Sequence, residues 1–191
     1  MKCAIILLCL LCLTQINSHA IEEDFAKIKE ISDSVVKDCA NDAEKVLALS
    51  HYVYLKLKPD ADKGIPPNAI MSTIDRLDSG VGWCNHQVAV FMRLAQAQGI
   101  KTRMLYLISR DGTSSPHTIG EALIDDKWCV VDPQLDFNVL VTRAEIQKNP
   151  DIIKNLPLMQ KRKIEIYKND EERFNEWAEL YYIPAMLVYE L

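Results

Sequence analysis

The sequence predicts an α+β fold in which helices come first and a small antiparallel sheet follows. Apolar residues recur every three or four positions in 21–38, 41–57 and 84–98, a spacing typical of amphipathic helices. Three short runs rich in β-branched and apolar residues then follow at 102–108, 118–124 and 128–131, as expected of strands joined by hairpins. We therefore expect one globular domain over residues 21–191.

The first 20 residues have the layout of a cleavable signal peptide. Lys2 provides the positive charge, Ala4–Leu13 is an unbroken apolar run, and Ser18-His19-Ala20 closes the segment. This run is shorter than the roughly 20 residues that a membrane-spanning helix needs, so no integral membrane segment is expected after cleavage. Cys9 and Cys12 each follow a leucine, which disfavours a lipoprotein anchor. The protein is expected to be periplasmic or secreted.

Charge and length restrict the partners of the mature chain. The formal net charge of the whole chain is −5, and it becomes −6 without Lys2. This mild acidity argues against nucleic acid or an anionic membrane as the partner. The remaining length suits a single domain with a sizeable core.

Helix boundaries can be read from capping residues. Asn41 and Glu44 form a candidate capping box that begins the second helix, and Pro59 ends it. After a loop rich in proline, glycine and aspartate, Asn68 is predicted to cap a short helix that stops near Gly80. The next helix begins at Cys84, and Gly99 lies where a C-terminal glycine would end it.

The strands and the tail complete the prediction. Residues 125–127 are expected to form a tight hairpin between the second and third strands. Thr142 and Glu145 form another candidate capping box, and residues 171–183 read as an amphipathic helix. The tail is therefore predicted to be helical.

Three cysteines remain after removal of residues 1–20, namely Cys39, Cys84 and Cys129. An odd number in an exported chain leaves at least one thiol unpaired or paired between chains. Either Cys39 and Cys129 form a disulfide and Cys84 is free, or all three are reduced.

The context of Cys84 suits an activated thiol. Gly80 and Gly82 precede it with little side-chain bulk, and it opens a predicted helix. The N-terminus of a helix lowers the pKa of a thiol, because free N–H groups favour a negative charge. His117 begins one strand and Asp132 ends the next, so the hairpin between them brings the two residues together. A carboxylate, an imidazole and a thiol in this order would form a nucleophilic triad.

These residues stand in a pattern that resembles the core of the transglutaminase-like superfamily, a branch of the papain-like cysteine hydrolase folds. The landmarks are G-W-C at Cys84, Gly99-Ile100 with Arg103, His117 with Glu121, and Trp128 with Asp132-Pro133, over about residues 66–134. The resemblance implies a bacterial-type secreted or periplasmic member with the catalytic triad Cys84, His117 and Asp132. It also implies a catalytic helix N-terminus packed on a small sheet that carries the histidine and the aspartate.

The chain departs from the family at two points. Many members carry an aromatic residue two positions after the histidine, where this chain has Ile119. Animal transglutaminases use a tryptophan well upstream of the cysteine to stabilise the oxyanion, and no tryptophan precedes Trp83 here. The main-chain N–H of Cys84 is one expected oxyanion donor. Trp83, Glu121 and Trp128 are the candidates for substrate or oxyanion support.

Other chemistries fit the sequence less well. His86 is two residues from Cys84, which points it away on a helix, so it is expected to be a surface or supporting histidine; His51 is assigned to packing. No C-x₂-C pair occurs among the cysteines that remain after residue 20, so no metal site and no cofactor is expected. Because some members of the family bind calcium, the need for calcium stays open.

The expected activity is that of an exported thiol-dependent hydrolase, a cysteine peptidase or amidase that cleaves an amide bond of a peptide or protein. Transfer of the acyl group to an amine uses the same triad and remains an alternative, as does a peptide-binding module without catalysis. A structural secreted domain is a third possibility, and the oligomeric state is open.

Overall fold

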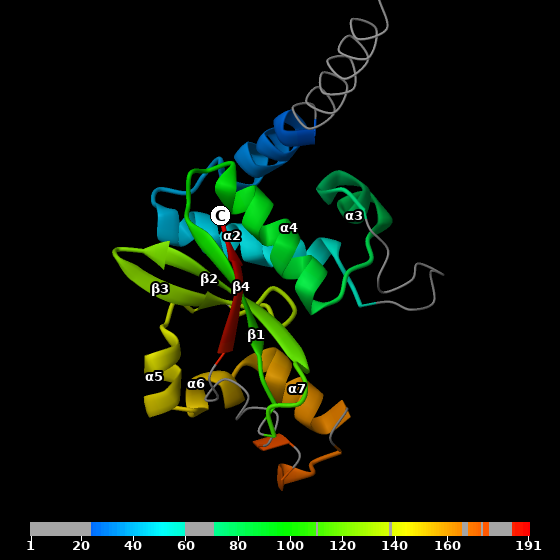
Figure 1. Cartoon of the computed structure of the whole chain (residues 1–191), viewed down its shortest axis with the longest axis vertical. Coiled ribbons are helices and arrows are strands. Elements are labelled where there is room, and N and C mark those ends of the chain that lie inside the picture. Colours follow the sequence, from blue (N-terminus) through cyan, green and yellow to red (C-terminus); the bar gives the residue numbers. More distant parts are fainter. Residues whose placement is uncertain are drawn as a thin grey trace, which may run out of the picture.

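The structure is a computed structural model that describes residues 24–59, 71–109, 111–137, 139–165, 168–172, 174–175 and 185–191, so the predicted signal peptide and Asn68 lie outside the described residues. Residues 24–36 are helical. The helices that follow them are α2 (Asp42–Lys56), α3 (Thr73–Ser79) and α4 (Cys84–Gln96), and α5 (Arg143–Lys148), α6 (Asp151–Lys154) and α7 (Pro157–Glu165) come after the hairpins. The strands are β1 (Thr102–Leu107), β2 (His117–Ile124), β3 (Lys127–Val131) and β4 (Ala185–Glu190). Figure 1 shows these elements along the chain.

The helices before the sheet begin at side-chain caps. The Asn41 carboxamide oxygen accepts the Glu44 N–H at 2.9 Å, which confirms the predicted start of α2. The short helix α3 begins later than predicted, because the Ser72 hydroxyl accepts the Asp75 N–H at 3.1 Å and takes the capping role given to Asn68. Gly80 ends α3 with a φ of 67°, a left-handed conformation that glycine adopts readily.

The sheet is antiparallel with the order β3-β2-β1-β4. The turn between β2 and β3 has positive φ at both Asp125 (48°) and Asp126 (60°). This is the backbone twist that two-residue hairpins need, and it confirms the predicted hairpin.

The strand β4 corrects the prediction of a helical tail. It pairs with β1, and the main chains of Thr102 and Leu191 exchange two hydrogen bonds of 2.8 and 2.9 Å at one end of the pair. A short apolar run such as residues 185–190 has no periodicity that separates a strand from a buried helix. The outer edge of β1 supplies the backbone partners that make it a strand.

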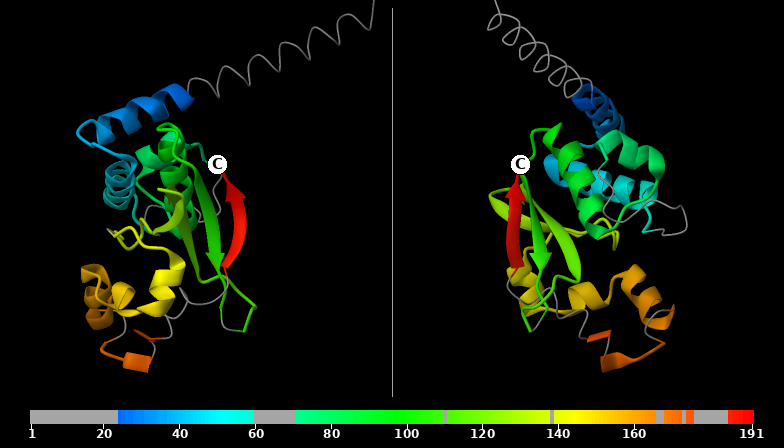
Figure 2. Two further views of the ribbon diagram at one scale, coloured as in Figure 1. Left: turned by 90° about the vertical axis from the view of Figure 1, so that its left-hand side faces the viewer. Right: turned by 45° about the vertical axis from the view of Figure 1, so that its right-hand side comes forward.

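The two faces of the sheet pack into two hydrophobic clusters. Ala122, Cys129 and Val131 belong to the cluster that α2 and α4 complete. Ile119 and Val130, on the opposite face by strand alternation, pack with residues of α5, α6 and α7. In Figures 1 and 2 these last three helices gather at the end of the molecule away from residues 24–36.

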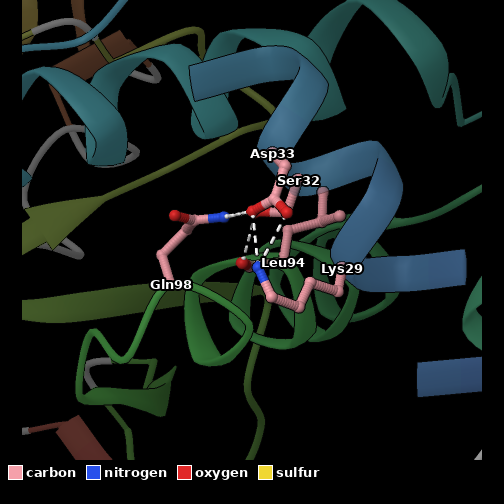
Figure 3. A network of polar contacts seen from close by, with 5 residues as sticks. All are labelled: Lys29, Ser32, Asp33, Leu94 and Gln98. Carbon is pink, nitrogen blue, oxygen red and sulfur yellow. Dashed lines mark hydrogen bonds and ion pairs between the residues drawn. The ribbon is translucent and has the colours of Figure 1, made fainter. Parts of the chain in front are cut away.

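The helical residues 24–36 are fastened to the end of α4 by polar contacts (Figure 3). The buried Ser32 hydroxyl donates to the Leu94 carbonyl at 2.8 Å, and the Gln98 side chain donates to Ser32 and to Asp33. Hydrogen bonds from Lys29 and Gln98 hold the pKa of Asp33 below its ordinary value. The C-terminal end of α4 is thus held by residues 24–36 in addition to its contacts with the sheet.

Within the described ranges, none of the helices has the length and apolar character needed to cross a membrane.

Candidate active site

Cys84 is the first residue of α4, and the loop before it is tightly held. The Arg76 side chain is buried and donates to the Val81 carbonyl at 3.3 Å. A Cβ on Gly82 would lie 3.1 Å from Leu57 Cδ1 and 3.4 Å from His86 Cβ. The absence of a side chain at Gly82 therefore lets the loop pass close to α2 as it enters α4. The half-buried thiol of Cys84 lies at the N-terminal end of the helix.

His117 and Asp132 meet side chain to side chain. His117 Nε2 lies 2.6 Å from Asp132 Oδ2, and the two side chains are only 3% and 0% exposed. His117 is the first residue of β2, and Asp132 directly follows the last residue of β3. The prediction that the hairpin brings these two residues together is fulfilled in the structure.

A turn after β3 orients the carboxylate of Asp132. Its second oxygen, Oδ1, accepts the N–H groups of Gln134 at 3.0 Å and Leu135 at 3.3 Å. Its main-chain carbonyl accepts the N–H of Phe137 at 3.2 Å. The buried side chains of Leu135 and Phe137 anchor the turn in the second hydrophobic cluster. One carboxylate oxygen is thereby held by the turn and the other is presented to His117.

The thiol and the imidazole have pKa values shifted in opposite directions. Burial alone would raise the pKa of Cys84, but the hydrogen bond and charge of His117 and hydrogen bonds from Thr118 outweigh it and lower that pKa. Burial alone would lower the pKa of His117, but the charge and hydrogen bond of Asp132, helped by Cys84, raise it to about 9. Because Nε2 is bonded to Asp132, Nδ1 is the ring nitrogen left for Cys84. The arrangement favours a thiolate–imidazolium pair at neutral pH.

The sequence analysis missed Thr118, whose side chain and backbone both help to lower the pKa of Cys84 through hydrogen bonding. It is 5% exposed and directly follows His117 in β2. Strand alternation was the available signal, because Thr118 shares a sheet face with Gly120 and Ala122, which faces the cluster that α4 completes.

Glu121 and Trp128 lie together in a cluster apart from the triad. The Glu121 carboxylate is 2% exposed and accepts from Arg103 Nε at 2.6 Å, while the Arg103 guanidinium lies 4.1 Å from the centre of the Trp128 ring. Burial raises the pKa of Glu121 against the hydrogen bond and charge of Arg103. Four strand residues, about 13 Å, separate Glu121 from His117 along β2. Glu121 and Trp128 therefore both contact Arg103 on the sheet and lie away from the triad. Arg103 is the arginine of the landmark that begins with Gly99-Ile100.

Trp83 remains beside the nucleophile. It precedes Cys84 directly and is 41% exposed, which is high for a tryptophan. Its main-chain N–H donates to His86 Nδ1 at 3.3 Å, so His86 supports the entry into α4. The assignment of His51 to packing is wrong, because its exposed ring pairs with Asp136 at 2.8 Å, in the turn that carries Asp132.

The described cysteines Cys39, Cys84 and Cys129 are all free thiols. Burial, together with nearby carboxylates, raises the pKa of Cys39 and of Cys129, in contrast to Cys84. Within the described part of the chain, no group of three or more His, Cys, Asp or Glu residues is arranged to hold a metal ion.

Comparison with known proteins places the chain in a family. The model of the transglutaminase-like superfamily matches residues 29–133. No match is found among curated proteins. A candidate cysteine protease from Cytophaga hutchinsonii is similar in structure, with 19% identity, a TM-score of 0.48 and coverage of 58% of this chain and 37% of that one. A candidate protease from Parabacteroides distasonis shows 16% identity, a TM-score of 0.47 and coverage of 56% and 23%.

This chain therefore spans well under half the length of either solved protein. The family model, in contrast, covers more than half of this chain. The protein belongs to the transglutaminase-like superfamily.

Proposed function

We propose that the protein is a thiol-dependent hydrolase that cleaves an amide bond in a peptide or protein. Cys84 is the nucleophile, His117 the general acid and base, and Asp132 the residue that orients and charges the imidazole. The observation that carries the proposal is the unbroken chain of contacts from Cys84 through His117 to the buried Asp132, with the pKa of the thiol lowered and that of the imidazole raised.

The reaction follows from these positions. The Cys84 thiolate attacks the carbonyl carbon of the substrate and forms a C–S bond, while the charge moves to the carbonyl oxygen. The main-chain N–H of Cys84, at the start of α4, is the oxyanion donor that this chain offers. The His117 imidazolium gives its proton to the amine nitrogen, the C–N bond breaks, and a thioester remains.

Water completes the cycle. Neutral His117 accepts a proton from water, the hydroxyl oxygen attacks the thioester carbon, and the C–S bond breaks to release a carboxylic acid. The thiolate of Cys84 and the imidazolium of His117 are then restored. The carboxylate of Asp132 stays ionised throughout and stabilises each imidazolium state.

The substrate class is proposed from what flanks the nucleophile. Trp83 offers an exposed aromatic surface at the residue before Cys84, and such surfaces bind the apolar parts of peptide chains. Trp83 is accordingly the candidate contact to the acyl part of the substrate.

A peptide mixture tests the proposal against its two rivals. The purified protein is incubated with the peptides, with and without a primary amine, beside Cys84→Ala, and products are identified by mass. New carboxyl termini made only by the protein with Cys84 support hydrolysis. Amide adducts with the added amine in place of new carboxyl termini would show acyl transfer. Peptide retention without any covalent change would show a binding module.

We also propose export with removal of residues 1–20, based on the layout of that segment. Expression of the full chain in a bacterium, followed by mass analysis of the cytoplasmic, periplasmic and medium fractions, tests it. A product that begins at Ile21 is expected. An uncleaved chain in the cytoplasm, or one carrying a lipid, would contradict this expectation.

A further inference from the structure

We propose that the Thr118 hydroxyl is a second side-chain donor to the Cys84 thiolate, acting beside His117. The proposal rests on the proposed nucleophilic role of Cys84 and adds a residue to it. Thr118 provides a hydrogen bond that does not depend on ionisation, so it stabilises the thiolate in every protonation state of His117.

The packing of α4 on β2 places Thr118 against Cys84. A Cβ on Gly120 would lie 3.4 Å from Val88 Cγ1 and 3.7 Å from Phe91 Cδ1, so β2 and α4 are in close contact at Gly120. Cys84 precedes Val88 by about one helical turn, and Thr118 precedes Gly120 by two strand residues on the same face. These two steps cover nearly equal lengths, about 6 Å along the helix and about 6.6 Å along the strand. One step towards the start of each element from the contact of Gly120 with Val88 therefore brings Thr118 next to Cys84.

The sheet register leaves room for this contact. The pairing of β2 with β3 ends at Gly120 opposite Val131, so Thr118 extends past the end of β3. On its other side Thr118 pairs with Tyr106 of β1. Hydrogen bonding from the side chain and the backbone of Thr118 is among the causes that lower the pKa of Cys84 at this position. Because Thr118 is 5% exposed, water competes little for its hydroxyl.

The surroundings contain few other groups that act on the thiolate. The charge that lowers the pKa of Cys84 is that of His117 from β2, and Asp132 lies behind His117 at the end of β3. On α4 itself, His86 is engaged by the main chain of Trp83, and the charge of Arg76 from α3 acts on His86. The removal of the Thr118 hydroxyl should therefore change the pKa of Cys84.

The test compares Thr118→Val, which keeps the shape and removes the hydroxyl, with Thr118→Ser, which keeps the hydroxyl. The rate of Cys84 alkylation by iodoacetamide is measured by intact mass from pH 5 to pH 10. A hydrogen bond to a charged group justifies an expected loss of about tenfold at pH 6 in Thr118→Val. The acid limb should move to higher pH, while the rate on the alkaline plateau should not fall, because a more basic thiolate is more nucleophilic. Thr118→Ser should recover most of the rate at pH 6.

Two results would overturn the proposal. One is a pH profile of Thr118→Val that coincides with that of the unaltered protein. The other is an equal slowing of both variants at every pH, which would mean that Thr118 serves packing alone. Thr118→Ala replaces Thr118→Val in the same comparison if the valine variant does not fold, as judged by circular dichroism.

The background of His117→Ala separates this proposal from the proposed function. Cys84 in His117→Ala should still react faster than in the double variant His117→Ala/Thr118→Val. Equal alkylation rates in the single and the double variant would refute the role of Thr118. They would not count against the proposed triad. Failure of peptide cleavage, with these differences preserved, would instead count against the proposed hydrolysis.

Discussion

The carboxylate of Asp132 is buried without exposed surface, yet it has partners for both of its oxygens. Buried charges persist in proteins when they are paired and hydrogen-bonded. A triad carboxylate needs a fixed position and a charged partner. The turn of residues 132–137 fixes the position of Asp132, and His117 is its charged partner. The imidazole gains an orientation and a raised pKa from the same contact.

Replacement of this carboxylate by an amide should disable the site. In Asp132→Asn the charge that raises the pKa of His117 is lost, so the imidazolium is depleted at neutral pH. We expect kcat/KM for peptide cleavage to fall by about 10²- to 10⁴-fold. Asp136→Asn is the matched control, since Asp136 lies in the same turn but pairs with His51. Comparable losses in both variants would mean that the turn, not the Asp132 charge, matters.

The pKa shifts also define a pH window. The pKa of His117 is raised to about 9, so its proton persists above the ordinary histidine range. Its contribution to folding stability is then full below about pH 6.5, the ordinary pKa, and is lost as the pH rises through about 9. The pKa of Cys84 is lowered, so its thiolate forms at lower pH than that of an ordinary cysteine.

Peptide cleavage and alkylation should therefore differ at high pH. Cleavage needs the His117 proton for the leaving amine and should decline above about pH 9. Alkylation needs only the thiolate and should stay on its plateau. Rates of both reactions measured from pH 5 to pH 10.5 check this, and a parallel decline of both would argue against His117 as the acid.

At the scale of the elements, the site depends on how the chain enters α4. Gly82 is the point of closest approach, because a Cβ there would lie 3.1 Å from Leu57 Cδ1. Leu57 is also held from α4, since Gln87 Nε2 donates to its carbonyl at 2.8 Å. The end of α2 and the start of α4 therefore fix each other.

Gly82→Ala should test this coupling. The added methyl group must displace Leu57 or the loop, which we expect to cost about 1–2 kcal/mol and to slow Cys84 alkylation at pH 6. Gly120→Ala is the control, because its Cβ would make an ordinary contact of 3.4 Å with Val88. Urea unfolding and alkylation of both variants provide the measurements. A Gly82→Ala protein as stable and reactive as Gly120→Ala would contradict the account.

The elements near the triad could be predicted because local signals agree with the fold. Asn41, the turn at Asp125 and Asp126, and Gly99 each stand where the structure uses them. Gly99 has a φ of 73° just after α4. These residues fix boundaries within a few positions of the chain, where sequence patterns are informative.

Long-range features could not be predicted in this way. Strand β4 depends on the edge of β1, some 80 residues away in the chain, and the contact of Thr118 with Cys84 depends on the packing of α4 on β2. His51 pairs with Asp136 only because α2 lies beside the turn after β3. A hydroxyl or an imidazole in a periodic run carries no sign of such partners.

At the scale of the whole molecule, the sheet separates two hydrophobic clusters. The triad is assembled from the ends of three elements. Cys84 begins α4, His117 begins β2, and Asp132 follows β3. The site therefore depends on the packing of α4, β2 and β3 against one another. Strand β4 covers the outer edge of β1, which would otherwise expose unpaired backbone groups.

Removal of residues 185–191 tests what β4 contributes to the sheet. We expect the truncated protein to lose several kcal/mol of unfolding free energy or to aggregate, because β1 loses its outer partner. Urea unfolding and light scattering give the measurement. Full stability in a monomeric truncated protein would show that β4 adds nothing to the sheet.

The central claim is that the Cys84 thiolate pairs with His117, which is hydrogen-bonded to Asp132. Locating the residue that is alkylated tests this claim most directly. The mature protein is exposed briefly to iodoacetamide at pH 6 beside Cys84→Ala and His117→Ala, and the modified residue is located by mass. Cys39 and Cys129 are internal controls, because their thiols have raised pKa values. Single labelling at Cys84 that is absent in Cys84→Ala and slowed in His117→Ala is the predicted result. Labelling that is absent, spread over the three thiols, or unchanged in His117→Ala would contradict the account.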